Sequence, residues 1–358
     1  MVEILGIRRE SYMTDPLKNP AHKEPGFLES LSEFLLGRRR PIDCVQVEVS
    51  SACTARCAYC PQSADAGSWQ ARNMEASTFA ALWPLLRHSA RVHLQGWGEP
   101  LPHPRFFDFA AFARKAGCAV SSTSCGLYMH EDMAHRIVKS GMDVLAFSLA
   151  GTDEASNAIR RGAPFAKVCE NIRLMAAVRK KTGAVHLNLH CAYILLADRM
   201  EAVSALPNLA SELGLHAAVV STLDYIAAPG QESLAIAPHE ADKIARAREL
   251  LEKAAAQAAK LGLGFHYALP CPEPRRTCRE HIEHSLYVDA EGALSPCIYV
   301  NLPAKDANAH RRIFGNANET DALACWRGER FAAFREALEA GRPETPCMHC
   351  AKRFEKTS

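Results

Sequence analysis

Short apolar runs alternate with longer amphipathic stretches over most of the chain. After residue 41, each run typical of a strand is followed by a segment whose apolar residues recur at helical spacing. This alternation predicts parallel strands joined by crossover helices. The predicted strands cover residues 45–49, 91–95, 119–123, 144–148, 185–190 and 217–221, and the predicted helices lie near 76–89, 104–116, 130–140, 164–181, 198–213 and 238–261. We therefore expect an α/β fold, a partial (β/α)6 barrel of the TIM type.

The pattern changes at two places, which predicts three parts. Residues 1–40 form an N-terminal extension with one amphipathic helix near 27–36, and residues 41–265 form the barrel. After about residue 265 the alternation stops and Cys and Pro become dense, so residues 266–358 are expected to form a small Cys-rich domain. Within it, two apolar runs around residues 289–292 predict a hairpin over 285–300, and a short helix is expected at 330–339.

Composition excludes several classes of protein. The 358 residues carry a net charge of +2, so no overall field draws the chain to nucleic acid or to an anionic membrane. The 14 cysteines are about 4% of the chain, well below the density of a disulfide scaffold, and reduced thiols are expected. Because no signal peptide and no apolar run of about 18 residues is found, we expect a cytoplasmic protein.

Three cysteines lie close together directly after the first predicted strand. Cys53, Cys57 and Cys60 fall within SSACTARCAYCPQ, at the end of the strand where barrel enzymes place their sites. Three thiolates can hold zinc with a fourth ligand, or three irons of a four-iron cluster. In the second case one iron stays open to a small chelating molecule. Structural cysteines are the third alternative.

The cysteine spacing, with Tyr59 before the last cysteine, resembles the CxxxCxxC signature of the radical SAM superfamily. Later segments fit the same family in order: GWGEP at 96–100 resembles its GGEP element, and SLAG at 148–151 with Ile159 and Arg160 resembles its SLDG and iRxG elements. The resemblance implies a 4Fe-4S cluster on the three cysteines that binds S-adenosylmethionine (SAM). The implied cofactor contacts are Tyr59, Gly98, Glu99, Ser148 and Arg160, with Arg161 as an alternative to Arg160.

A second group of cysteines lies in the C-terminal part. Cys278 is followed by thirteen residues, Gly292, four residues and Cys297, and Cys347 and Cys350 form a CxxC pair. This order resembles the SPASM and twitch domains of radical SAM enzymes, and the short C-terminus favours the twitch type. The resemblance implies one auxiliary 4Fe-4S cluster on these four cysteines, with Cys271 as a possible substitute. A structural zinc site is the alternative. The remaining cysteines are expected in the core: Cys44, Cys118, Cys125, Cys169, Cys191 and Cys325.

The family resemblance also implies a reaction. An electron from a donor such as flavodoxin or ferredoxin would cleave SAM reductively, and the 5′-deoxyadenosyl radical would abstract hydrogen from an unactivated carbon. If the auxiliary cluster accepts the remaining electron, the protein is an oxidoreductase. A small-molecule substrate is favoured because only about 40 residues precede the barrel. The alternatives are modification of a peptide or protein, and a non-enzymatic iron–sulfur carrier or sensor. Asn188, His190 and Tyr225 are the polar residues expected at the barrel mouth.

Overall fold

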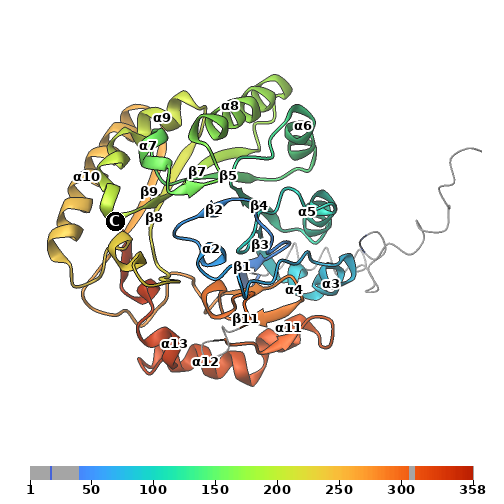
Figure 1. Cartoon of the computed structure of the whole chain (residues 1–358). Coiled ribbons are helices and arrows are strands. Elements are labelled where there is room, and N and C mark those ends of the chain that lie inside the picture. Colours follow the sequence, from blue (N-terminus) through green and yellow to red (C-terminus); the bar gives the residue numbers. More distant parts are fainter. Residues whose placement is uncertain (1–16, 18–39, 306–310, 358) are drawn as a thin grey trace, which may run out of the picture.

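The computed structural model describes Leu17, residues 40–305 and residues 311–357. Its centre is a curved sheet of parallel strands (Figure 1). The six predicted strands are confirmed in their predicted order, and a seventh follows. The strands are β1 (Ile42–Val47), β3 (Ser89–Leu94), β4 (Ala119–Ser124), β5 (Val144–Leu149), β7 (Asn188–Leu195), β8 (Ala217–Thr222) and β9 (Gly264–Pro270). The predicted extension helix near 27–36 lies outside the described residues.

Helices cover the outer side of this sheet (Figure 1). They are α3 (Ala76–Ala81), α4 (Trp83–Arg87), α5 (Phe106–Lys115), α6 (Glu131–Lys139), α8 (Phe165–Thr182), the 3-10 segment η2 (Ala197–Ala205), α9 (Leu206–Glu212) and α10 (Ala241–Lys260). Two predicted helices are each divided into two. Pro84 and Pro207 lie in the first turns of α4 and α9, where a missing N–H is tolerated, whereas each would break the interior of a longer helix.

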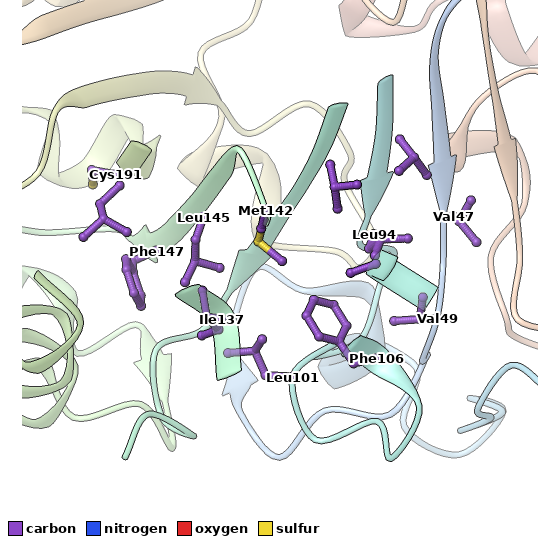
Figure 2. Packing of buried hydrophobic residues seen from close by; sticks show 14 of the residues in the cluster. Val47, Val49, Leu94, Leu101, Phe106, Ile137, Met142, Leu145, Phe147 and Cys191 are labelled. Atoms are coloured by element: carbon purple, nitrogen blue, oxygen red, sulfur yellow. The ribbon is translucent and has the colours of Figure 1, made fainter. Parts of the chain in front are cut away.

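The main core fills the layer between the sheet and its helices (Figure 2). Successive side chains of a strand point to opposite faces, so every second residue of β5 is buried in this layer: Leu145, Phe147 and Leu149. The intervening residues, among them Ser148, are less buried and face the inside of the barrel. The carboxyl ends of the strands therefore carry polar side chains toward a common interior.

The C-terminal part attaches to both edges of the parallel sheet. β10 (Ser285–Val288) pairs in parallel with β1 and forms the predicted hairpin with β11 (Ala293–Ser295), while Gly292 takes a φ of +85° in the turn. β12 (Gly315–Asn316) extends this edge, and β13 (Glu355–Thr357) pairs with β9 at the other. These residues thus span the open side of an incomplete barrel.

Three short helices complete the C-terminal part: α11 (Ala322–Arg327), α12 (Glu329–Glu339) and α13 (Thr345–Met348). The first two lie beside the β11 edge of the sheet in Figure 1. α12 confirms the helix expected at 330–339. The expected boundary at residue 265 falls at the start of β9, which continues the parallel sheet. Within the described part of the chain, no helix combines the length and the apolar character needed to cross a bilayer.

Candidate functional site

A cavity of about 560 Å³, here named the barrel cavity, lies at the carboxyl ends of the parallel strands. Its wall contains all three N-terminal cysteines of the predicted cluster and all five predicted cofactor contacts. These residues are Cys53, Cys57, Tyr59, Cys60, Gly98, Glu99, Ser148 and Arg160. They come from four segments that are far apart in sequence: the loop after β1, the loop after β3, the end of β5 and the segment at residue 160.

The cysteine loop is anchored to the segment that carries Arg160. β2 (Arg56–Cys57) pairs antiparallel with β6 (Arg160–Arg161), so that Cys57 lies opposite Arg160. Arg160 is 3% exposed and faces the barrel cavity, whereas Arg161 is exposed on the outside. The pairing therefore distinguishes two neighbouring arginines that the sequence leaves equivalent.

The loop from Gly96 to Glu99 passes very close to the cysteine loop. A Cβ atom on Gly98 would lie 2.4 Å from the backbone oxygen of Ser50, so only glycine fits there. The Glu99 N–H donates a hydrogen bond to the oxygen of Ala52 at 2.8 Å, which fixes the approach of the two loops. The loop can accommodate the large side chain of Trp97, because this side chain lines the barrel cavity and does not lie between the two loops.

Glu99 is almost fully buried, at 3% exposure. Its carboxylate accepts a hydrogen bond from the Ser124 hydroxyl at 2.8 Å and another from the Cys125 N–H at 2.6 Å. Burial raises the pKa of Glu99, and these hydrogen bonds oppose the shift. The carboxylate is thus held in one orientation at the wall of the cavity.

Cys125 is buried as expected, but it also lines the barrel cavity beside Cys53. A hydrogen bond from the Cys125 thiol is the largest cause of the lowered pKa of Cys53. Burial instead raises the pKa of Cys60 to about 11. A thiolate at Cys60 therefore needs positive charge nearby, which a bound metal supplies. The available signal for Cys125 was its position two residues after the strand predicted at 119–123.

A second cavity of about 460 Å³, here named the auxiliary cavity, lies in the C-terminal part. The four predicted C-terminal ligands all line it: Cys278, Cys297, Cys347 and Cys350. The first two flank the β10–β11 hairpin, and the CxxC pair lies at α13. Cys271 lies outside this set, with its thiol donating to the oxygen of Glu273 at 3.3 Å.

The lining of the auxiliary cavity is otherwise largely apolar, with Ile282, Phe334 and Leu338 packed beside the thiols. Burial raises the pKa of Cys347 to about 12, and burial likewise holds the pKa of Cys297 well above its ordinary value. Four partly buried thiols whose pKa values are raised in this way do not ionise near neutral pH without a cation. Their surroundings therefore suit thiolates that a metal stabilises.

The two cavities share a wall, here named the partition, to which Asp224, Tyr225, Glu280 and Tyr299 contribute. Lys352 lies beside it on the barrel-cavity side and forms an ion pair with Asp224 at 2.6 Å. Burial raises the pKa of Glu280 although Lys352 opposes the shift. The partition is the part of the site that sequence patterns missed, except for Tyr225, because its residues come from three distant segments.

Two of the polar residues expected at the barrel mouth are placed elsewhere. Asn188 and His190 lie near the start of β7, away from the carboxyl end, and neither lines the barrel cavity. The prediction was wrong because the strand covers 188–195 and not 185–190: Val185 is 81% exposed, and Ala192, Tyr193 and Ile194 reach the cavity instead. Tyr225 does line the cavity.

Comparison with known families identifies both regions. The family model described as the Radical SAM superfamily matches residues 47–191, which contain the first three cysteines. The chain carries a radical SAM domain. A second model, described as an iron-sulfur cluster-binding domain and named SPASM, matches residues 278–351, from the first auxiliary cysteine to just past the last. These domains imply a SAM-binding 4Fe-4S cluster and an auxiliary cluster.

Among curated proteins, the chain is similar to the tungsten-containing aldehyde ferredoxin oxidoreductase cofactor-modifying protein of Pyrococcus furiosus. The two are 24% identical over 308 residues, which cover 81% of this chain and 82% of that relative. The PqqA peptide cyclase of Streptomyces rochei is 25% identical over 214 residues, which cover 58% of this chain and about half, 55%, of the relative.

Solved radical SAM structures share the fold. Streptococcus suis SuiB bound to S-adenosylmethionine gives a TM-score of 0.62 at 14% identity, covering 90% of this chain and 74% of SuiB. Native anSMEcpe with bound AdoMet gives a TM-score of 0.61 at 15% identity, covering 83% of this chain and 84% of that one.

Proposed function

We propose that this radical SAM enzyme cleaves SAM reductively and oxidises a substrate at an unactivated carbon. The observation that carries the proposal is the common lining of the barrel cavity by three cysteines and five cofactor-contact residues. In this proposal the barrel, residues 41–265, holds SAM and its cluster, and residues 266–358 hold the auxiliary cluster. Cys53, Cys57 and Cys60 each bind one iron, and the fourth iron binds SAM.

The residues around the cavity fit the functional groups of SAM. Glu99 and the backbone at Gly98 would bind the ammonium, because the Glu99 carboxylate is buried and already oriented by Ser124. Arg160 and Ser148 would bind the carboxylate or the ribose. The Nε atom of Arg160 is buried and has no hydrogen-bond partner among the described residues, so it is available to a ligand. Tyr59 packs against the small apolar cluster of Ala150, Leu196 and Leu223.

When bound and reduced, the cluster supplies the electron that cleaves SAM to methionine and a 5′-deoxyadenosyl radical. The protein's part is to position the substrate hydrogen and to exclude water. The cavity volume of about 560 Å³ is within the range of ligand sites that bury most of a small molecule. A cavity of this size is unnecessary for an iron–sulfur carrier, which favours the enzyme over that alternative.

The spacing of the cysteines favours iron clusters over single zinc ions. Four sulfurs around zinc, each at about 2.3 Å, lie roughly 3.8 Å from one another. Among the described residues, no three His, Cys, Asp or Glu side chains are grouped closely enough to hold one ion. Thiolates that bind different irons of a cluster are farther apart, and the auxiliary cavity of about 460 Å³ has room for such a cluster.

The auxiliary cluster is proposed to sit on Cys278, Cys297, Cys347 and Cys350. Full ligation by four thiolates leaves no iron open to substrate, and this favours electron transfer as its role. The auxiliary cavity shares the partition with the barrel cavity, so an electron left on the substrate would have a short path to it. This supports a net oxidation, and a flavodoxin or ferredoxin remains the proposed reductant of the first cluster.

Two substrate classes are proposed. The first is a small molecule, because the Pyrococcus relative is named for modifying a cofactor. The second is a peptide side chain, because the Streptomyces relative is a peptide cyclase. The second candidate is at least as well supported by the relatives as the first.

The proposal is tested by incubating the anaerobically reconstituted full-length protein with SAM and dithionite. Formation of methionine and 5′-deoxyadenosine is expected, and the variant Cys57→Ala should form neither. Wild-type protein that carries iron but forms no 5′-deoxyadenosine would overturn the proposal in favour of a carrier or sensor. Cell extract divided into small-molecule and peptide fractions then separates the substrate classes, because the active fraction should increase 5′-deoxyadenosine formation.

A further inference from the structure

The partition contains more negative than positive side chains. The Lys352 ammonium lies 2.6 Å from a carboxylate oxygen of Asp224 and 3.8 Å from one of Glu280. Asp224 also accepts a hydrogen bond from the Thr222 hydroxyl at 2.9 Å, so its carboxylate is well satisfied. Among the described residues, Lys352 is the cation that both carboxylates share. The ion pair between Lys352 and Glu280 is therefore the longer and weaker of the two.

The three side chains differ in their access to the cavity. The side chains of Lys352 and Asp224 are 8% and 5% exposed, while that of Glu280 is 24% exposed and lines the barrel cavity. A carboxylate in a largely buried wall is costly unless a cation pairs with it. Since Asp224 already holds Lys352, a ligand that brings its own positive charge would complete the pairing of Glu280.

Aromatic rings surround this part of the cavity. The ring centroids of Trp97 and Tyr225 are 5.9 Å apart, those of Trp97 and Tyr299 are 6.0 Å apart, and those of Tyr225 and Tyr299 are 6.2 Å apart. All three side chains line the barrel cavity with Glu280. Aromatic faces attract cations and also cover aliphatic stems, so this wall suits a charged nitrogen on a hydrocarbon chain.

The buried indole N–H of Trp97 is a second unsatisfied group in the same wall. Its Nε1 atom has no hydrogen-bond partner among the described residues. This unpaired donor and the Glu280 carboxylate, whose cation lies 3.8 Å away, line the same cavity and would both gain a partner from a bound molecule.

We propose that the partition binds a positively charged alkylammonium or guanidinium group of the substrate, with Glu280 as its counter-ion and Trp97, Tyr225 and Tyr299 against its stem. This rests on the proposed function, in which the barrel cavity holds the substrate. It narrows both substrate classes to molecules with a cationic nitrogen: an amine-bearing metabolite, or a lysine or arginine side chain of a peptide.

The test uses three probes of equal length and different charge: pentylammonium, 1-pentanol and pentanoate. Each is titrated calorimetrically into the anaerobic, cluster-loaded full-length protein with SAM bound. We expect pentylammonium to bind more tightly than pentanol by about tenfold, equivalent to about 1.4 kcal/mol, and pentanoate to bind most weakly. Equal binding of pentylammonium and pentanol, or preference for pentanoate, would overturn the inference.

Variants test the assigned counter-ion. Glu280→Gln should reduce the preference for pentylammonium over pentanol to within about twofold, whereas Glu273→Gln, which alters an exposed carboxylate nearby, should leave it intact. Lys352→Met should strengthen the preference, because it removes the competing cation. A preference that survives Glu280→Gln would show that another group binds the amine and would refute the assignment.

Iron content and absorption spectra are recorded for every variant, because Glu280 and Lys352 each lie two residues from a proposed cluster ligand. If Glu280→Gln loses iron, Asp224→Asn replaces it: Lys352 is then released to neutralise Glu280, and the amine preference should again disappear. Cleavage of SAM is measured on the same samples. A protein that cleaves SAM but shows no amine preference would refute this inference and leave the proposed function standing.

Discussion

The backbone N–H of Trp97 donates a hydrogen bond to the Oε1 atom of Glu48 at 2.8 Å. Glu48 lies just beyond the end of β1 and is fully buried, and the second oxygen of its carboxylate has no partner among the described residues. A Cβ atom on Gly96 would lie 2.4 Å from the Cβ atom of Glu48. Glu48 therefore supports the loop that carries Glu99 from behind, out of reach of the cavity.

This buried carboxylate predicts a pH-dependent stability. Burial raises the pKa of Glu48 from its ordinary value of 4.5 to about 7. The folded protein therefore holds the proton more tightly than the unfolded chain, and Glu48 lowers the free energy of unfolding as pH rises from about 4.5 to about 7. In the wild type this loss amounts to at most about 1.4 kcal/mol per pH unit. It should be absent from Glu48→Gln.

Thermal unfolding across this pH range measures the effect. The melting temperature of Glu48→Gln should fall less than that of the wild type between acidic and neutral pH, and the variant should be the more stable of the two above neutral pH. Glu252→Gln, at an exposed position on α10, serves as the control and should follow the wild type. Parallel curves for all three proteins would show that Glu48 is ionised throughout.

Substitution of Glu99 should weaken SAM binding. Glu99→Gln keeps an oxygen that can accept from Ser124 or Cys125 but loses the charge proposed to bind the SAM ammonium. A hydrogen bond to a charged group contributes about 1.5–3 kcal/mol, so the Kd for SAM should rise by about 10- to 100-fold. Equilibrium dialysis of the cluster-loaded protein measures this, with iron content as the check on folding. An unchanged Kd would remove Glu99 from the SAM site.

The two C-terminal alternatives, Cys347 and Cys271, give opposite results when removed. Cys347 lines the auxiliary cavity and Cys271 does not, so only Cys347→Ala should lose auxiliary iron. Reconstituted wild-type protein should carry about eight irons, which two 4Fe-4S clusters require. We expect about half as many in Cys347→Ala and the full number in Cys271→Ala. Loss of iron in Cys271→Ala instead would make Cys271 the ligand.

The fold was predictable because short apolar runs alternate with longer segments of helical period, which is typical of parallel strands joined by helices. The hydrophobic pattern was less informative about the first and last residues of each element, because capping and turn residues determine those positions. The helix α8 ends at Thr182, and Gly183 then takes a left-handed conformation. The exposed Val185 belongs to the turn that follows, so β7 begins at Asn188 and not at residue 185. β9 was missed because its run, GFHYALP, contains Gly, His and Pro and lacks the repeated Val and Ile of a buried strand.

The residues proposed to contact SAM could be selected from the sequence because they lie in short motifs at strand ends, and they line one cavity in the fold. The partition was not, because it depends on how β8, the segment after Cys278 and the C-terminal turn meet in space. Asp224 and Lys352 are 5% and 8% exposed only in the folded chain, and neither has a sequence neighbour that signals the ion pair. Charged residues of this kind usually lie on the surface, so sequence patterns alone favour that interpretation.

The most direct measurement is the electron paramagnetic resonance spectrum of the reduced N-terminal cluster with and without SAM. The variant Cys347→Ala/Cys350→Ala is used, so that the auxiliary cluster does not contribute. If Cys53, Cys57 and Cys60 leave one iron open, addition of SAM should shift the spectrum, because SAM becomes a ligand of that iron. A spectrum that SAM leaves unchanged would contradict an open iron at these three cysteines.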